Sequence, residues 1–112
     1  MTVLEILNKF RKQIHGMEGF LGHSQDQPPL EVSVCEHALA FVDVLPETEL
    51  LKTVGVFPTG RQSIQFERDD ASNLYWEVEV YADRVVCYGD IMTHNPEGVE
   101  MEMSAAAKWF LG

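Results

Sequence analysis

The chain has 112 residues, of which 46% are hydrophobic, so one domain of ordinary size with a buried core is expected over residues 1–112. Eight Lys and Arg side chains stand against 18 Asp and Glu, which gives a net charge of -10. Such a surface repels phosphate backbones, so direct nucleic-acid binding is disfavoured and a basic protein partner is favoured. No apolar run has the length of a membrane span, and the N-terminus lacks a signal-peptide pattern, so we expect a cytoplasmic protein that does not bind membranes.

The first predicted element is a helix that begins after Thr2. Thr2 and Glu5 form the pattern of a capping box, in which each residue bonds the backbone of the other. Gly22 is the expected end of the helix. Apolar residues recur at steps of three and four residues, at Val3, Ile6, Leu7, Phe10, Ile14, Met17 and Leu21. Its polar face carries a local basic patch of Lys9, Arg11 and Lys12.

A second helix is predicted from about Glu31 to Leu45, within "LEVSVCEHALAFVDVLP". Its apolar residues fit a helical stripe, although the opening "LEVSV" also alternates like a strand. Pro46 ends this helix, and "ETELLK" is expected to be a short connecting turn.

From Val54 onward the hydrophobic period changes to two, which predicts a run of strands. The predicted strands are "VGVF", "QSIQFER", "LYWEVEVY" and "RVVCYGDI". A turn at Pro58–Gly60 separates the first two, and a tight connection at Ala82–Asp83 separates the last two. Gly60 followed by Arg61 is therefore interpreted as a turn leading into a strand, and Arg61 as a surface charge, and not as a phosphate loop.

A register for this sheet follows from keeping all apolar residues on one face. We predict that Phe66 lies opposite Trp76, which places Ile64 opposite Val78. The next pair of strands is expected to match Val80 with Val85 and Val78 with Cys87.

The residues between these apolar ones point to the opposite, outer face of the sheet, on which tyrosines and glutamates alternate. Here Glu67 is expected near Tyr75, Gln65 near Glu77, and Glu79 beside Ser63. Exposed tyrosines offer a large contact area with a polar tip, as interfaces often do. The alternatives are an ordinary outer face, which such cross-strand pairs stabilise anyway, or a face covered by a helix. The candidate binding residues are Glu67, Tyr75, Glu77, Glu79, Tyr81, Arg84 and Tyr88.

The C-terminal segment contains a loop, "THNPEG", and then "VEMEM", which alternates like a further strand. Ser104 is the predicted cap of a short helix, "AAAKWFL". Trp109 and Phe110 are expected to anchor that helix on the sheet, with an exposed docking tail as the alternative.

Other chemistry-bearing residues give weaker signals. The four histidines are scattered, so no metal or cofactor site is predicted. Cys35 and Cys87 belong to no CxxC motif and are interpreted as buried free thiols in a reducing compartment. The charged residues of a predicted hairpin tip are expected to be solvated; they are Glu67, Arg68, Asp69 and Asp70. The alternative is an enzyme that uses Glu67, Asp69, Asp70 or His94.

The stretch "FPTGRQSIQFERDDASNLYWEVEVYADRVVCYGD" resembles small uncharacterised bacterial proteins. In those proteins a Pro-x-Gly turn leads into a strand ending in Leu-Glu-Trp, and a second strand reads like Ile-Glu-Ile. The resemblance implies a bacterial or mobile-element origin and no particular activity. The matching residues are Pro58, Gly60, Phe66-Glu67 and Val78-Glu79-Val80, with Arg68 in the place of the tryptophan.

Together these observations predict an α+β fold with two N-terminal helices, an antiparallel meander of four to five strands, a short C-terminal helix and two layers. The favoured function is protein–protein binding through the outer Tyr/Glu face, as an adaptor, inhibitor or chaperone-like protein, and not catalysis. One alternative is a small-ligand- or metal-dependent enzyme that uses the acidic hairpin tip. Another is a structural subunit of a homodimer.

Overall fold

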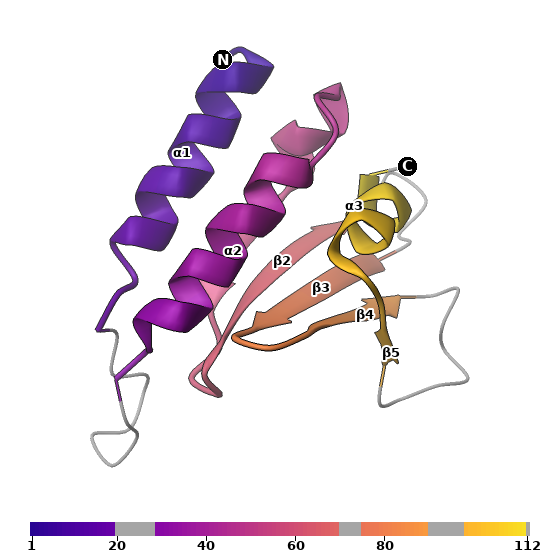
Figure 1. The fold of residues 1–112 in the computed structure, drawn as a ribbon. Helices are drawn as coiled ribbons and strands as arrows, with labels where there is room; N and C mark the ends of the chain where they lie inside the picture. Colours follow the sequence, from indigo (N-terminus) through magenta and orange to yellow (C-terminus); the bar gives the residue numbers. More distant parts are fainter. Residues whose placement is uncertain (20–28, 70–74, 90–97, 112) are drawn as a thin grey trace.

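The computed structural model describes residues 1–19, 29–69, 75–89 and 98–111. Helix α1 is followed by α2, the short 3-10 helix η1, five strands and α3 (Figure 1). Their bounds are α1 Val3–His15, α2 Val32–Val44, η1 Glu49–Thr53, β1 Gly55–Pro58, β2 Ser63–Asp69, β3 Tyr75–Tyr81, β4 Val85–Gly89, β5 Val99–Glu100 and α3 Met103–Leu111.

The strands form one antiparallel sheet in the order β1-β2-β3-β4-β5, which is a meander. Helix α2 packs on β2 and β3, and α3 packs on β3 and β4, while α1 lies against α2 and β1. Figure 1 shows α2 and α3 crossing the same side of the sheet. The predicted α+β class and element order are therefore confirmed, and the two-layer description stays a prediction. Among the described residues, no helix is long and apolar enough to cross a membrane.

Helix α1 begins as predicted but ends earlier. Thr2 Oγ1 accepts from the Glu5 backbone N–H at 3.1 Å, and the Glu5 carboxylate accepts from the Thr2 backbone, which completes the capping box. The helix ends at His15 and not at Gly22, which lies outside the described residues. Gly19 adopts φ +79° and its N–H bonds to the Leu30 carbonyl, so the chain has already turned toward α2.

Helix α2 agrees with its prediction, since Glu31 and Leu45 flank it as the N- and C-cap. The segment "ETELLK" contains all of η1 except its last residue, Thr53. The helix begins after Thr48, whose hydroxyl accepts from the Leu50 N–H at 2.9 Å. The β1–β2 turn contains two left-handed residues, Gly60 (φ +85°) and Gln62 (φ +57°). The Gln62 side chain accepts from the Glu31 N–H, which ties this turn to the start of α2.

The predicted register of β2 and β3 was wrong by two residues. Phe66 pairs with Val78 and Ile64 with Val80, so that Arg68, and not Phe66, lies opposite Trp76. A shift of two residues keeps every side chain on its face, so the apolar pattern could not separate the two registers. The observed register brings the Arg68 guanidinium within 3.9 Å of the Trp76 ring centroid.

The predicted register of β3 and β4 is confirmed. Val80 pairs with Val85 and Val78 with Cys87. The Tyr81 N–H donates to the Arg84 carbonyl at 2.9 Å, which closes the two-residue connection at 82–83.

At the C-terminal end, β5 is only two residues long, and α3 begins at Met103. Ser104 therefore lies inside the first turn of α3 and is not its cap. The expected anchoring is confirmed, because Phe110 is fully buried and a Cβ built on Gly89 would lie 3.0 Å from the Trp109 ring. Phe110 is consequently no part of an exposed docking tail.

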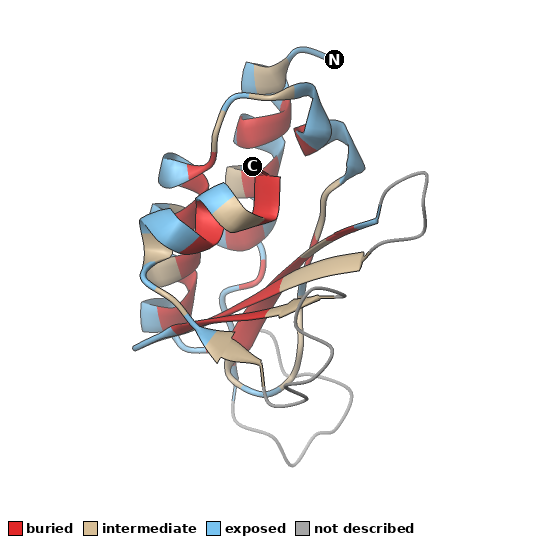
Figure 2. Cartoon of the chain, turned by 90° about the vertical axis from the view of Figure 1, so that its right-hand side faces the viewer, coloured by how far each residue is buried: buried red, intermediate tan, exposed pale blue. Residues whose placement is uncertain are grey.

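The core lies between the helices and the inner face of the sheet, which carries Ile64, Phe66, Val78 and Val80 (Figure 2). Phe41 of α2 meets Phe66 of β2 edge to face, with ring centroids 4.9 Å apart. Both cysteines are buried free thiols, as predicted.

Candidate functional site

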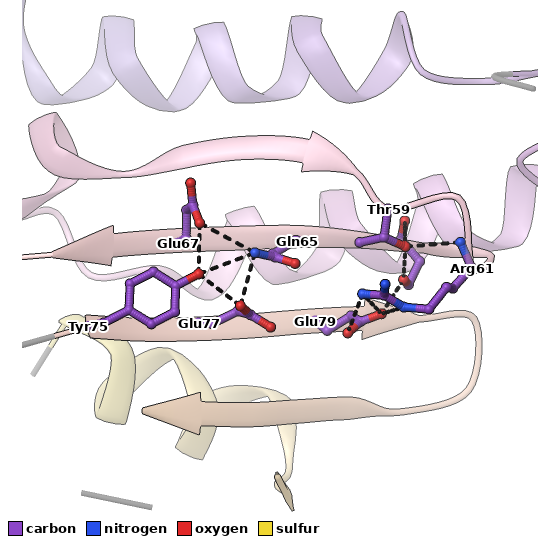
Figure 3. Close-up of polar contacts among 8 residues, drawn as sticks. Thr59, Arg61, Gln65, Glu67, Tyr75, Glu77 and Glu79 are labelled. Carbon is purple, nitrogen blue, oxygen red and sulfur yellow. Dashed lines mark hydrogen bonds and ion pairs between the residues drawn. The ribbon is translucent and has the colours of Figure 1, made fainter. Parts of the chain in front are cut away.

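The candidate site is the outer face of the sheet, on the side opposite the core. Strands β2 and β3 place their odd-numbered side chains there because successive residues of a strand point to opposite faces. Figure 3 shows two groups of polar contacts on this face, one at each end of the β2–β3 pair. The first group, here called the tyrosine cluster, contains Gln65, Glu67, Tyr75 and Glu77. The second, here called the Glu79 cluster, contains Thr59, Arg61, Ser63 and Glu79.

In the tyrosine cluster, one phenolic hydroxyl lies between two carboxylates. Tyr75 Oη is 2.7 Å from Glu67 Oε2 and 2.8 Å from Glu77 Oε1. Gln65 Nε2 donates to Glu77 Oε1 at 3.0 Å and lies 3.4 Å from Glu67 Oε2 (Figure 3). A phenol carries one proton and donates to one carboxylate at a time. All the donors in the cluster are neutral groups facing two acidic side chains.

Within the described parts of the chain, neither Glu67 nor Glu77 forms an ion pair. Both side chains are half-buried, which limits how well water screens them from each other. Burial, followed by the hydrogen bonds to Glu67 and Glu77, raises the pKa of Tyr75 well above its usual value of 10.0. Tyr75 is therefore a proton donor across the physiological range, and the cluster as a whole attracts positive charge.

A cavity of about 300 Å³ opens beside the tyrosine cluster. Glu67 and Tyr75 form part of its wall, together with Asp69, Gly55 and Lys52. Its volume is at the lower end of what small-molecule pockets have, and it is large enough to admit a single long side chain from another molecule.

The Glu79 cluster is closed, because its carboxylate is already paired. Arg61 Nη2 lies 3.1 Å from Glu79 Oε2, and the Ser63 hydroxyl donates to the same oxygen (Figure 3). Thr59 Oγ1 accepts from the Arg61 N–H at 3.1 Å and contacts the Ser63 hydroxyl. Glu79 is only 2% exposed.

One prediction about this cluster is thereby corrected. Glu79 was expected on a solvent-facing surface, but it is buried beneath the Arg61 guanidinium. Arg61 is exposed, as a surface charge should be, and it is also the cation that makes burial of this carboxylate tolerable.

The remaining predicted site residues lie around these clusters. Tyr88 is opposite Glu77, and burial raises the pKa of its phenol. A Cβ on Gly98 would meet the Tyr88 ring at 2.5 Å, so residue 98 lies directly on this tyrosine. At the β3–β4 turn the exposed Arg84 guanidinium lies 4.1 Å from the Tyr81 ring centroid.

The predicted neighbours on β2 and β3 meet diagonally and not directly. In the observed register, Glu67 is opposite Glu77, and Gln65 is opposite Glu79. The expected side-chain contacts of Glu67 with Tyr75, and of Gln65 with Glu77, still form because diagonal neighbours on a sheet are within reach of long side chains.

The predicted hairpin-tip site is not a cluster of solvated charges. Arg68 is 8% exposed, its Nε donates to the Phe110 carbonyl, and its guanidinium stacks on Trp76 beneath α3. Asp69 is exposed, whereas Asp70 and His94 lie outside the described residues. Among the residues that are described, no group of three or more His, Cys, Asp or Glu side chains could hold a metal ion.

Strongly alkaline pH should reveal the environment of Tyr75. Its folded-state pKa is raised, so the stability linked to its proton is complete below the unfolded value of about 10 and is lost as the pH rises above it. We expect Tyr75→Phe to reduce the steepness of this alkaline loss by roughly one fifth, because it removes one of five groups with raised pKa values, which are three tyrosines and the two buried cysteines. The measurement is the urea unfolding free energy of both proteins from about pH 8 to 11. If the unfolding free energies of the two proteins fell equally steeply with pH, the raised pKa of Tyr75 would be contradicted, whatever the difference in their stability at neutral pH.

Comparison with known proteins finds no matching family model, no matching curated protein and no matching solved structure.

Proposed function

We propose that this chain binds a basic segment of a protein partner through the outer face of its sheet, acting as an adaptor, inhibitor or chaperone-like binder. The observation that carries the proposal is the tyrosine cluster. Two half-buried carboxylates share neutral donors there and form no ion pair with any residue that the structure describes.

The chemistry of this cluster suits an arginine or lysine side chain of the partner. A guanidinium offers five N–H donors in a planar fork, which can bond the Glu67 and Glu77 carboxylates together. The net charge of -10 draws basic segments toward the protein and repels phosphate backbones. A basic protein is thus favoured over a nucleic acid.

The surroundings of the cluster supply the rest of a binding surface. Tyr75 and Tyr88 bring aromatic area with a polar tip, as the centres of interfaces commonly do. The adjoining cavity of about 300 Å³ gives room for the stem of the inserted side chain. Tyr81 and Arg84 lie at the far end of the same face, where they can form its rim.

The test is capture of partners from the native host by the tagged chain, comparing Glu67→Gln/Glu77→Gln with the unmodified protein. The matched control is Glu36→Gln/Glu102→Gln, which removes the same charge from two exposed positions on α2 and just before α3. We expect a basic protein to be captured by the unmodified chain and by the control, and to be lost from the outer-face variant. The same protein should be released at about 0.5 M salt, where exposed charges are screened.

A partner that the outer-face variant retains would contradict the proposal, as would one that the control loses equally. A cytoplasmic location is part of the proposal, since a reducing compartment keeps the two buried thiols free. The enzyme and the homodimer remain alternatives without a specific observation in their favour.

A further inference from the structure

A second cavity, of about 210 Å³, lies between α1 and η1, with Val54, just after η1, also in its wall. Its inner wall is built from core side chains: Ile6 and Phe10 of α1 and Leu51 of η1 are 5%, 3% and 1% exposed. Because these residues are fixed by the packing of the core, the cavity is already formed and needs no rearrangement to receive a ligand.

The rim of this cavity is basic, in contrast to most of the protein. Lys9 of α1 and Lys52 of η1 line it from two different elements. Lys9 forms no ion pair with any residue that the structure describes. Lys52 pairs with Glu49 at 2.6 Å, but both side chains are mostly exposed, so that pair is weak and exchangeable.

Among the residues that the structure describes, no carboxylate lines the cavity itself. The acidic side chains of α1 and η1 are Glu5, which is engaged in the capping box, and Glu49, which pairs with Lys52. The rim also carries Met1, which is 71% exposed. The cavity thus combines an apolar interior with two ammonium groups at its mouth.

We propose that this cavity binds a small amphiphilic carboxylate, with its apolar body against Ile6, Phe10 and Leu51 and its head group between Lys9 and Lys52. The apolar wall removes the hydrocarbon from water, and the two ammonium groups bond the head group. The local charge selects an anion even though the net charge of the protein is negative, because the head group lies in direct contact with the lysines and within a Debye length of them. This site is distinct from the outer sheet face, although Lys52 also lines the cavity beside the tyrosine cluster.

Three probes of equal chain length separate the apolar from the charge contribution: octanoate, octanol and octylammonium. Binding is followed by backbone amide shifts in ¹⁵N-labelled protein, which also locate the site. We expect octanoate to bind most tightly, octanol more weakly and octylammonium weakest, with shifts confined to residues around α1, η1 and the start of β1. Each exposed lysine is expected to contribute about a fivefold increase in octanoate affinity.

The decisive variant is Lys9→Glu/Lys52→Glu, and its matched control is Lys12→Glu/Lys108→Glu. Both make the same change in net charge at exposed lysines, but only the first pair lines the cavity. We expect the first variant to weaken octanoate by about tenfold or more and to prefer octylammonium, and the control to keep the original order.

Three results would overturn the proposal. They are octylammonium binding as tightly as octanoate, equal loss of octanoate affinity in the variant and its control, and absence of binding by all three probes. The Glu67→Gln/Glu77→Gln variant should retain octanoate binding, so failure of this site and failure of the protein-binding face can be told apart.

Discussion

Replacing Arg68 with alanine should lower the free energy of unfolding by about 3 kcal/mol. Arg68 is 8% exposed, and its guanidinium lies between the sheet and α3. Its Nε donates to the Phe110 carbonyl near the end of α3, and its charged plane stacks 3.9 Å from the Trp76 ring centroid. The substitution removes a charge-assisted hydrogen bond and a stacked cation together and leaves a space beneath α3.

The neighbouring residue offers a matched control. Asp69 lies on the same strand but is exposed, so Asp69→Ala should change stability by about 0.5 kcal/mol or less. Arg68→Lys keeps the charge but loses the planar fork, so it should fall between wild type and Arg68→Ala. Urea unfolding measures all three. A loss of less than about 1 kcal/mol for Arg68→Ala would show that the guanidinium does not hold α3 on the sheet.

Replacing Arg61 with methionine should lower stability by about 2 kcal/mol, because it leaves a buried carboxylate without its cation. The Glu79 side chain is 3% exposed, whereas that of Arg61 is 60% exposed. Removing the arginine should therefore cost more stability than removing the charge of the glutamate. In Glu79→Gln the arginine returns its charge to water, and we expect a loss of about 1 kcal/mol or less.

The double variant Arg61→Met/Glu79→Gln tests the cause. It removes the buried Glu79 charge that Arg61→Met leaves unpaired. The double variant should therefore be more stable than Arg61→Met alone, recovering about half of the lost free energy of unfolding. Equal stability of the single and double variants would mean that the cost of Arg61→Met comes from lost packing and not from the unpaired carboxylate.

Local signals in the sequence were sufficient for the order of the helices and for the register of one hairpin, but not for the end of α1 or the start of α3. The Thr2–Glu5 capping box located the start of α1 because both bonds lie within one turn. Because the connection at 82–83 has only two residues, just one register of the β3–β4 pair kept the apolar residues on the same face of the sheet. The β2–β3 pair was different, because its register could slip by two residues without moving any side chain to the other face.

The candidate site was predicted in part. Alternation placed Glu67, Tyr75 and Glu77 on one face, and that placement was sufficient to bring them into contact across the strands. The burial of Arg68 and Glu79 could not be predicted in this way. It depends on the Phe110 carbonyl, 42 residues away, and on Arg61, 18 residues away, and no local pattern reports such partners.

The most direct test of the outer face as a cation-binding surface is a titration of ¹⁵N-labelled protein with an amidated tetra-arginine peptide at about 0.1 M salt. The account predicts saturable amide shifts in β2 and β3 around Glu67, Tyr75 and Glu77. These shifts should be lost in Glu67→Gln/Glu77→Gln, kept in Glu36→Gln/Glu102→Gln, and weaker with a tetra-lysine peptide. Shifts spread evenly over the acidic surface, or unchanged in the Glu67→Gln/Glu77→Gln variant, would contradict it.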